Sequence, residues 1–278
     1  MNFSKSIKVS GRLLSFDQPR VMGVMNVTKD SFYAKSRVVN EDDILNRAGE
    51  MLKEGADILD VGGYSSRPGA KEVPIKEEIG LTSYAIELIK SHFPDALISI
   101  DTFRSEVAEA AMRAGATIVN DISAGTLDPK MVDFITANQV PYIAMHMRGN
   151  PENMHKMTKY THIIPEILFY FSQLIERLKD KGHTDLIIDP GFGFAKTTEQ
   201  NFEILGNLEL FKNLESIILV GLSRKSMIYK TLKTDPSEAL NGTTVLNTLA
   251  LAKGADILRV HDVRPAVEAI KLTIKTLT

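Results

Sequence analysis

Several apolar runs in this chain end in a polar side chain that is suited to binding a ligand. The run at 186–189 ends in Asp189, and Pro190, Gly191 and Gly193 then break the strand and bend the backbone. A charge at the tip of a buried strand costs free energy unless a ligand, a metal or a cation meets it. The same pattern recurs along the chain, with polar tips at Asn26, Arg67, Asp101, Asn120, His146, Asp189, Lys225, Arg259 and His261.

Each of these tips, taken alone, also has a structural explanation. Asp101 or Asp121 can cap the following helix. His146 can be a core histidine with satisfied hydrogen bonds, and Arg259 can pair with Asp256. A cluster of unlike charges at one cavity mouth, however, needs a ligand to offset its desolvation. The set as a whole therefore indicates a functional site.

The tips fall into two chemical groups. One group offers acceptor oxygens to a flat heterocycle rich in N–H donors, and consists of Asp101, Asn120 and Asp189. The other is cationic, suits phosphate, and consists of Arg67, Lys225, Arg259 and His261. Asn26 adds a neutral oxygen, which is a ligand that Mg2+ accepts beside phosphate oxygens.

The sequence lacks the residues that several other kinds of catalysis require. The chain has no cysteine, which excludes disulfides, thiolate catalysis and cysteine metal sites. No motif places a serine or lysine nucleophile beside an obvious base. The histidines His146, His155 and His162 do not have the spacing of zinc ligands. We therefore expect binding geometry and electrostatics to carry the chemistry.

The polar tips follow a regular succession of elements. Apolar runs predict eight strands at 21–25, 56–61, 97–100, 117–119, 142–145, 186–189, 217–220 and 256–260. They alternate with helical patterns at 41–54, 75–91, 105–114, 129–138, 160–181, 199–211, 236–253 and 264–276. Such βαβ repetition, without a G-x-G-x-x-G turn after the first strand, predicts a (β/α)8 barrel. The strand ends of such a barrel meet at one mouth.

The rest of the chain is consistent with one domain. Segments 7–9 and 13–14 predict a short N-terminal β-hairpin within residues 1–19, and the barrel takes 20–278. The 278 residues are 44% hydrophobic and 24% charged, with a formal net charge of −2. This balance argues against nucleic-acid and anionic-membrane partners. No signal peptide or membrane span is evident, so we expect a cytoplasmic protein.

Six motifs closely resemble those of the dihydropteroate synthase family, in the same order. They lie at 22–32, 62–69, 145–149, 189–194, 223–226 and 259–262. The resemblance implies a barrel enzyme of folate synthesis. It would join p-aminobenzoate to 7,8-dihydropterin-6-ylmethyl diphosphate, giving 7,8-dihydropteroate and pyrophosphate. In the family, pyrophosphate leaves first and the arylamine then captures the pterin methylene cation.

The resemblance also assigns residues to roles. It implies pterin binding by Asp101, Asn120, Met145, Asp189, Phe194, Gly221 and Lys225, with Asp101 and Lys225 catalytic. Pyrophosphate would be held by Asn26, Arg67, Arg259 and His261, with Mg2+ as cofactor on Asn26. The p-aminobenzoate side would be formed by Ser66, Arg67, Pro68, Phe194, Lys225 and Ser226. Sulfonamides would compete for that side, and the family further implies a homodimer through the later helices.

Three departures from the family pattern stand out. In the loop that follows the first strand, Lys29 replaces a proline and Ala34 replaces an acidic residue. In the motif at 62–69, Tyr64 and Ser66 replace glutamate and threonine. Directly after the motif at 189–194, Ala195 replaces a glycine. These changes bear on closure of the first loop and on sulfonamide sensitivity.

Three alternatives belong to other classes. A folate-dependent methyltransferase domain would share the pterin slot, but should lack the loop 223–226 and would need a corrinoid partner. A non-catalytic pterin-binding paralogue is suggested by the altered first loop. A phosphate–sugar barrel should show glycine-rich turns after strands seven and eight, where this chain has arginine and lysine.

Overall fold

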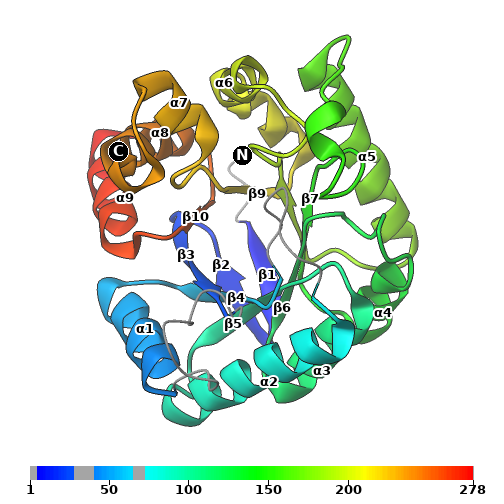
Figure 1. The fold of residues 1–278 in the computed structure, drawn as a ribbon. Coiled ribbons are helices and arrows are strands. Elements are labelled where there is room, and N and C mark those ends of the chain that lie inside the picture. The colour runs from blue at the N-terminus through cyan, green and yellow to red at the C-terminus, as the bar shows by residue number, and fades with distance from the viewer. Residues whose placement is uncertain (1–4, 28–40, 65–72, 278) are drawn as a thin grey trace.

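Eight parallel strands close into a barrel, and helices form a ring around it (Figure 1). In the computed structural model, residues 5–27, 41–64 and 73–277 are described. Around the barrel the strands follow the order β10-β3-β4-β5-β6-β7-β8-β9. Their bounds are β3 Arg20–Asn26, β4 Ile58–Gly62, β5 Leu97–Asp101, β6 Ile118–Asp121, β7 Tyr142–Met145, β8 Leu186–Asp189, β9 Ile217–Val220 and β10 Ile257–Val260. The predicted (β/α)8 fold is confirmed.

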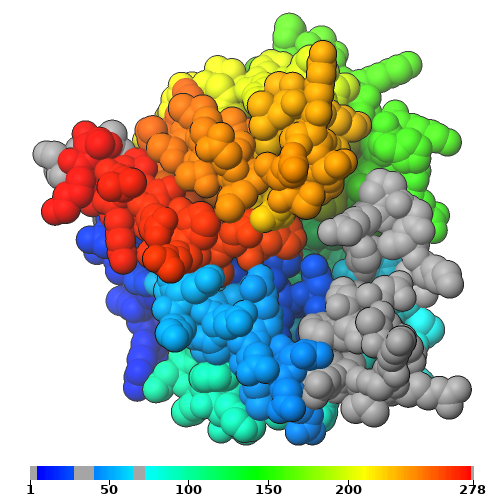
Figure 2. Space-filling model, turned by 60° about the vertical axis from the view of Figure 1, so that its left-hand side comes forward, coloured from blue at the N-terminus to red at the C-terminus, as the bar shows by residue number. Residues whose placement is uncertain are grey.

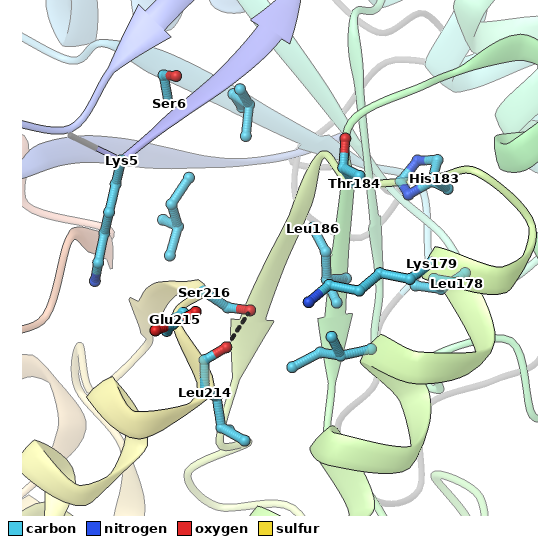
Figure 3. A pocket seen from close by; sticks show the side chains of 13 residues that line it. Lys5, Ser6, Leu178, Lys179, His183, Thr184, Leu186, Leu214, Glu215 and Ser216 are labelled. Atoms are coloured by element: carbon cyan, nitrogen blue, oxygen red, sulfur yellow. Dashed lines mark hydrogen bonds between the residues drawn. The ribbon is translucent and has the colours of Figure 1, made fainter. Parts of the chain in front are cut away.

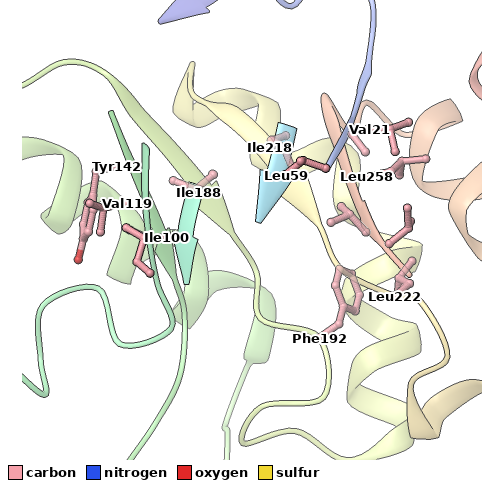
Figure 4. Close-up of a cluster of buried hydrophobic side chains, with 14 of the residues drawn as sticks. Val21, Leu59, Ile100, Val119, Tyr142, Ile188, Phe192, Ile218, Leu222 and Leu258 are labelled. Carbon is pink, nitrogen blue, oxygen red and sulfur yellow. The ribbon is translucent and has the colours of Figure 1, made fainter. Parts of the chain in front are cut away.

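Side chains alternate between the two sides of the barrel wall, so each strand is buried on both sides. On β10, Leu258 packs outward in the same cluster as Val21, while Ile257 packs inward with Met22. Figure 4 shows part of the outward-facing cluster, to which Phe192 also belongs. Burial on both sides explains why these strands read as continuous apolar runs in the sequence.

Nine α-helices cover the outside of the barrel in the described ranges. They are α1 Glu41–Glu54, α2 Ile75–His92, α3 Ser105–Ala114, α4 Lys130–Asn138, α5 Ile163–Asp180, α6 Thr198–Gly206, α7 Ser226–Leu232, α8 Leu240–Ala252 and α9 Val263–Leu277. Three short 3-10 helices add to them, at Met154–Lys156, Leu208–Leu214 and Pro236–Glu238. In this part of the chain, no helix is long and apolar enough to cross a membrane.

In the second half of the chain, the helix predictions were wrong at three places. The pattern at 199–211 is two elements, because α6 ends at Gly206 and a 3-10 helix follows. The pattern at 236–253 likewise begins with a 3-10 turn before α8. The sequence reading missed α7, which begins at Ser226, because seven residues are too few to display a helical period.

A β-hairpin closes the floor of the barrel, as predicted. Strands β1 Ser6–Val9 and β2 Arg12–Ser15 are joined by two residues with positive φ, the backbone that a tight hairpin turn requires. Ile7, Val9 and Phe16 pack against the inward-facing side chains at the strand beginnings. Lys5 fixes the hairpin through an ion pair with Asp256 at 2.7 Å.

A small cavity of about 210 Å³ lies beside this hairpin (Figure 3). It is lined by Lys5 and Ser6 of the hairpin, by Lys179 and His183 at the end of α5, and by Ser216 before β9. These residues lie at the amino ends of the strands. The cavity is therefore at the opposite end of the barrel from the polar strand tips.

Candidate active site

The inward-facing positions at the carboxyl ends of the strands bring polar side chains together at the barrel mouth. Arg259 on β10 is the centre of this group. Its Nε donates to Oδ2 of Asp60 at 2.6 Å, and its Nη2 donates to Oδ2 of Asp101 at 2.5 Å. Asn120 Nδ2 donates to the same Asp60 oxygen at 3.0 Å. The structure thus joins three predicted tips: Asp60 on β4 links Asn120 to Arg259, and Arg259 in turn binds Asp101.

These polar side chains meet because side chains along a strand point alternately into and out of the barrel. Ile58 and Ile118 face the barrel interior, so Asp60 and Asn120, two residues further along their strands, face it as well. Strand pairing places Asp101 directly beside Asn120. Asp121 has the opposite orientation, and its Oδ2 instead accepts from the Tyr142 hydroxyl at 2.7 Å.

Electrostatics at the mouth favour a carboxyl group that titrates near neutral pH. Burial raises the pKa of Asp101 to about 7, although the Arg259 guanidinium opposes the shift. Asp60, Glu78 and Asp121 are the neighbouring carboxylates that raise it further. Asp60 is fully buried, and its Oδ1 has no hydrogen-bond partner among the described residues. The mouth thus holds an acceptor atom that a donor-rich ligand can satisfy.

Lys225 and Asp189 bring a second set of opposite charges to the mouth, close enough to influence each other electrostatically. Lys225 Nζ donates to the Phe192 carbonyl and lies 5.0 Å from the centroid of the Phe194 ring. Desolvation lowers the pKa of Lys225 to about 8, and the Asp189 carboxylate is the main opposing influence. Burial also raises the pKa of Asp189, whose Oδ1 accepts from the Gly191 amide at 2.7 Å.

An apolar wall stands beside these polar groups. Met145, Ile122 and Ala195 belong to a separate buried cluster against which Phe194 packs. At Gly221, an added Cβ would lie 3.8 Å from Lys225 Nζ, so a side chain there would occupy space next to the ammonium. Acceptors on one side and sulfur, aliphatic and aromatic surface on the other are suited to a flat heterocycle.

The residues predicted for pyrophosphate and p-aminobenzoate are described only in part. His261 Nδ1 lies 3.0 Å from Ser223 Oγ, and its carbonyl accepts from Arg47 Nη2 at 2.8 Å. Asn26 is exposed at the end of β3, and Ser226 is half-buried at the start of α7. Ser66, Arg67 and Pro68 lie outside the described residues, as do Lys29 and Ala34.

One expectation about a single residue was wrong, and two residues were missed. His146 was expected at the mouth, but it faces outward, where its ring packs 5.0 Å from Tyr170. Arg259 pairs with Asp60, so the structural alternative of a pair with Asp256 does not apply. Asp60 escaped notice because it lies inside a predicted strand, yet a carboxylate within an apolar run is itself a signal. Lys196 was also missed, although it ends the loop that follows Asp189.

Comparison with known proteins identifies the family of the chain. The family described as "Pterin binding enzyme" matches residues 22–261. A dihydropteroate synthase of Synechocystis sp. is 42% identical over 255 residues, covering 91% of this chain and 88% of the relative. The chain belongs to the dihydropteroate synthase family. Another member of the family, from Escherichia coli strain K12, is 38% identical, covering 96% of this chain and 95% of that protein.

Solved structures of dihydropteroate synthases have the same fold. The Yersinia pestis enzyme, in a sulfonamide drug complex, has a TM-score of 0.91 at 35% identity, covering 98% of this chain and 99% of that one. The Xanthomonas albilineans enzyme in complex with 7,8-dihydropteroate has a TM-score of 0.88 at 32% identity, covering 99% of both chains. The resemblance seen in the motifs is thereby confirmed. The relatives' names favour the synthase over the methyltransferase and phosphate–sugar alternatives.

Proposed function

We propose that this chain condenses 7,8-dihydropterin-6-ylmethyl diphosphate with p-aminobenzoate, giving 7,8-dihydropteroate and pyrophosphate. The observation that carries the proposal is the set of inward-facing acceptors at one mouth, bounded by an apolar wall. Asp101, Asn120 and Asp189 supply oxygens for the N–H groups of the pterin, and Lys225 supplies a donor for its ring acceptors. Met145, Phe194 and Gly221 line the slot.

The reaction breaks the bond between the pterin methylene carbon and the diphosphate oxygen before the C–N bond forms. The electron pair leaves with pyrophosphate, and positive charge develops on the pterin. The Asp101 carboxylate stabilises that charge electrostatically. The arylamine nitrogen of p-aminobenzoate then donates its electron pair to the carbon and loses a proton to water. We place p-aminobenzoate against Phe194 and Lys225, where sulfonamides would compete for it, and we propose that Ser66, Arg67, Pro68 and Ser226 also bind it.

Arg259, His261, Arg67 and Asn26 would bind the diphosphate. Arg259 uses Nε and Nη2 for its two carboxylates, and no described residue accepts from its Nη1 hydrogens, which can bind an anion. The described residues contain no cluster of three His, Asp or Glu side chains that could hold a metal by themselves. A site of one amide oxygen completed by diphosphate and water suits Mg2+, which would supply charge neutralisation on the leaving group. Chelation should therefore weaken binding of the pterin diphosphate more than binding of the unphosphorylated pterin alcohol, as measured by calorimetry.

The decisive assay is pyrophosphate release from the pterin diphosphate, with and without p-aminobenzoate. The proposed enzyme releases pyrophosphate and forms 7,8-dihydropteroate in equal amounts when both substrates are present. Pterin binding without any turnover would instead identify a non-catalytic paralogue. A sulfonamide should inhibit the reaction, and added p-aminobenzoate should relieve this inhibition competitively.

We also propose a homodimer and a cytoplasmic location. Helices α8 and α9 lie side by side on one face of the molecule, orange and red in Figure 2. A groove of about 660 Å³ runs over them. Exposed apolar side chains on these two helices are Leu240, Val245, Leu249 and Leu272, of which Leu240 and Leu272 line the groove. A second copy of the chain is the partner that the family resemblance implies for such a surface.

A further inference from the structure

Lys196 is buried beneath the loop that joins β8 to α6. Its Nζ lies 2.9 Å from the carbonyl oxygens of Gly191 and Phe194, and 3.3 Å from that of His146. The fourth neighbour is His146 Nδ1, at 3.1 Å. The side chain of Lys196 is 8% exposed, so these protein atoms replace its hydration shell. One ammonium thus connects the loop after β8 to the end of β7.

The charge state of Lys196 decides how well these acceptors are satisfied. Burial, with Lys196 and Arg148 nearby, lowers the pKa of His146 to about 2, so its imidazole is neutral and Nδ1 can accept. An ammonium has three N–H donors for these four acceptors, whereas a neutral amine has only two. Burial lowers the pKa of Lys196 to about 7. Lys196 therefore has all three donors below neutral pH and loses one of them above it.

The other charged and titratable groups around Lys196 come from neighbouring elements. The Asp189 carboxylate at the end of β8 favours the charged ammonium, while Lys225 and Arg148 oppose it. The Tyr160 hydroxyl donates to the Ala195 carbonyl at 3.1 Å, and burial raises its pKa to about 12, so it stays neutral.

The loop needs such an anchor because its backbone is confined. Gly191 has φ +73°, and a Cβ added there would lie 2.1 Å from the His146 carbonyl oxygen. Ala195 adopts φ 50°, a left-handed conformation that is costly for a residue with a side chain. The same loop supplies the amide that binds Asp189 and carries the Phe194 ring. Any displacement of the loop therefore disturbs both groups.

We propose that Lys196 is a positioning residue for pterin binding, which holds the loop 190–195 in the conformation that presents Asp189 and Phe194. The inference rests on the proposed function. Lys196→Met removes the charge and the donors while keeping the length of the side chain. We expect the dissociation constant for the pterin alcohol to rise about tenfold at pH 6. The ratio of the variant's constant to that of the unchanged protein should be smaller at pH 8.5 than at pH 6, because the neutral amine of the unchanged protein then has two donors instead of three.

Isothermal titration calorimetry separates positioning from loss of fold. A partly unfolded sample lowers the number of binding sites, whereas a displaced loop raises the dissociation constant. Lys253→Met is the matched control, since Lys253 Nζ also donates to a carbonyl oxygen, that of Gly206 at 2.8 Å, but does so away from the mouth. We expect its dissociation constant to be unchanged.

Several outcomes would overturn the proposal. One is equal affinity of Lys196→Met and the unchanged protein at pH 6, and another is a ratio that stays the same up to pH 8.5. If Lys196→Met does not fold, Lys196→Gln takes its place, and failure of both would show that Lys196 is needed for the whole barrel. Absence of pterin binding by the unchanged protein would contradict the proposed function itself.

Discussion

Asp101 shares the Arg259 guanidinium with Asp60, and this sharing governs what a substitution at Asp101 does. Asp101→Asn removes the negative charge and nearly preserves the shape, while Asp60 keeps its contact with Arg259. We expect kcat to fall by roughly 10²–10³, the usual effect of losing one preorganised electrostatic group. Steady-state kinetics, together with an unchanged melting temperature, would support the assignment. A variant with the original kcat would refute it.

The same carboxyl group should be visible in the pH dependence of catalysis. Burial raises the pKa of Asp101 to about 7, so the group is protonated, and no longer stabilises a cation, below that pH. The value of kcat/KM should therefore decline as the pH falls below about 7, because this parameter reports ionisations of the free enzyme. In Asp101→Asn this acid limb should be absent.

Lys225 and Arg224 are adjacent cations with different roles. Lys225→Gln should weaken pterin binding, because the amide carries no charge and has a shorter reach. Arg224 is paired with Asp262 through Nε at 2.8 Å and Nη2 at 3.0 Å, so Arg224→Gln should lower stability and leave pterin affinity unchanged. Pterin titrations of both variants test this difference. Equal, small effects would place Lys225 outside the site.

At the scale of elements, most of the barrel was predictable because its signals are local. Strands buried on both faces appear as apolar runs, and α1 and α3 have the bounds that their patterns predicted. The helix α7 escaped prediction, as did the division of the pattern at 199–211. In both cases packing on the barrel, and not the local period, determines where the helix begins or ends.

The hairpin contributes stability and lies far from the chemistry. Ile7 is 1% exposed at the barrel floor, so Ile7→Ala should lower the free energy of unfolding by about 2–5 kcal/mol. At 25 °C kcat should be unchanged, because the mouth lies at the other end. Leu13→Ala, on the same hairpin but 77% exposed, is the control for denaturant titrations. A similar loss from both variants would contradict a role for the floor.

At the scale of the molecule, the α8–α9 face makes the proposed dimer testable. Leu272 is 70% exposed there, and Leu272→Glu would place a charge in an apolar contact. Light scattering should give twice the mass of one chain for the unchanged protein and about one chain for Leu272→Glu. The same change at Leu13 should leave the mass unchanged. A monomeric unchanged protein would contradict the proposal.

The site was predictable as a list of residues but not as a set of pairs. Strand tips identified Asp101, Asn120, Asp189 and Arg259, since the barrel brings such tips together. The partner of Arg259 depends on the strand order and register, which place Asp60 of β4 one strand beyond β3 from Arg259 of β10, and a single sequence does not contain that information. Lys196 was missed for the same reason, because its four acceptors are brought together only by folding.

The Arg259 contacts have a consequence for biosynthesis. Arg259 follows Asp60 by 199 residues and Asp101 by 158. While the ribosome is still making the last strand, both carboxylates lack their counter-charge, and β3 and β9 present unpaired edges. A stalled or truncated nascent chain of this protein is therefore a natural client for chaperones and proteases. Docking of β10 ends that exposure and assembles the binding mouth in the same event.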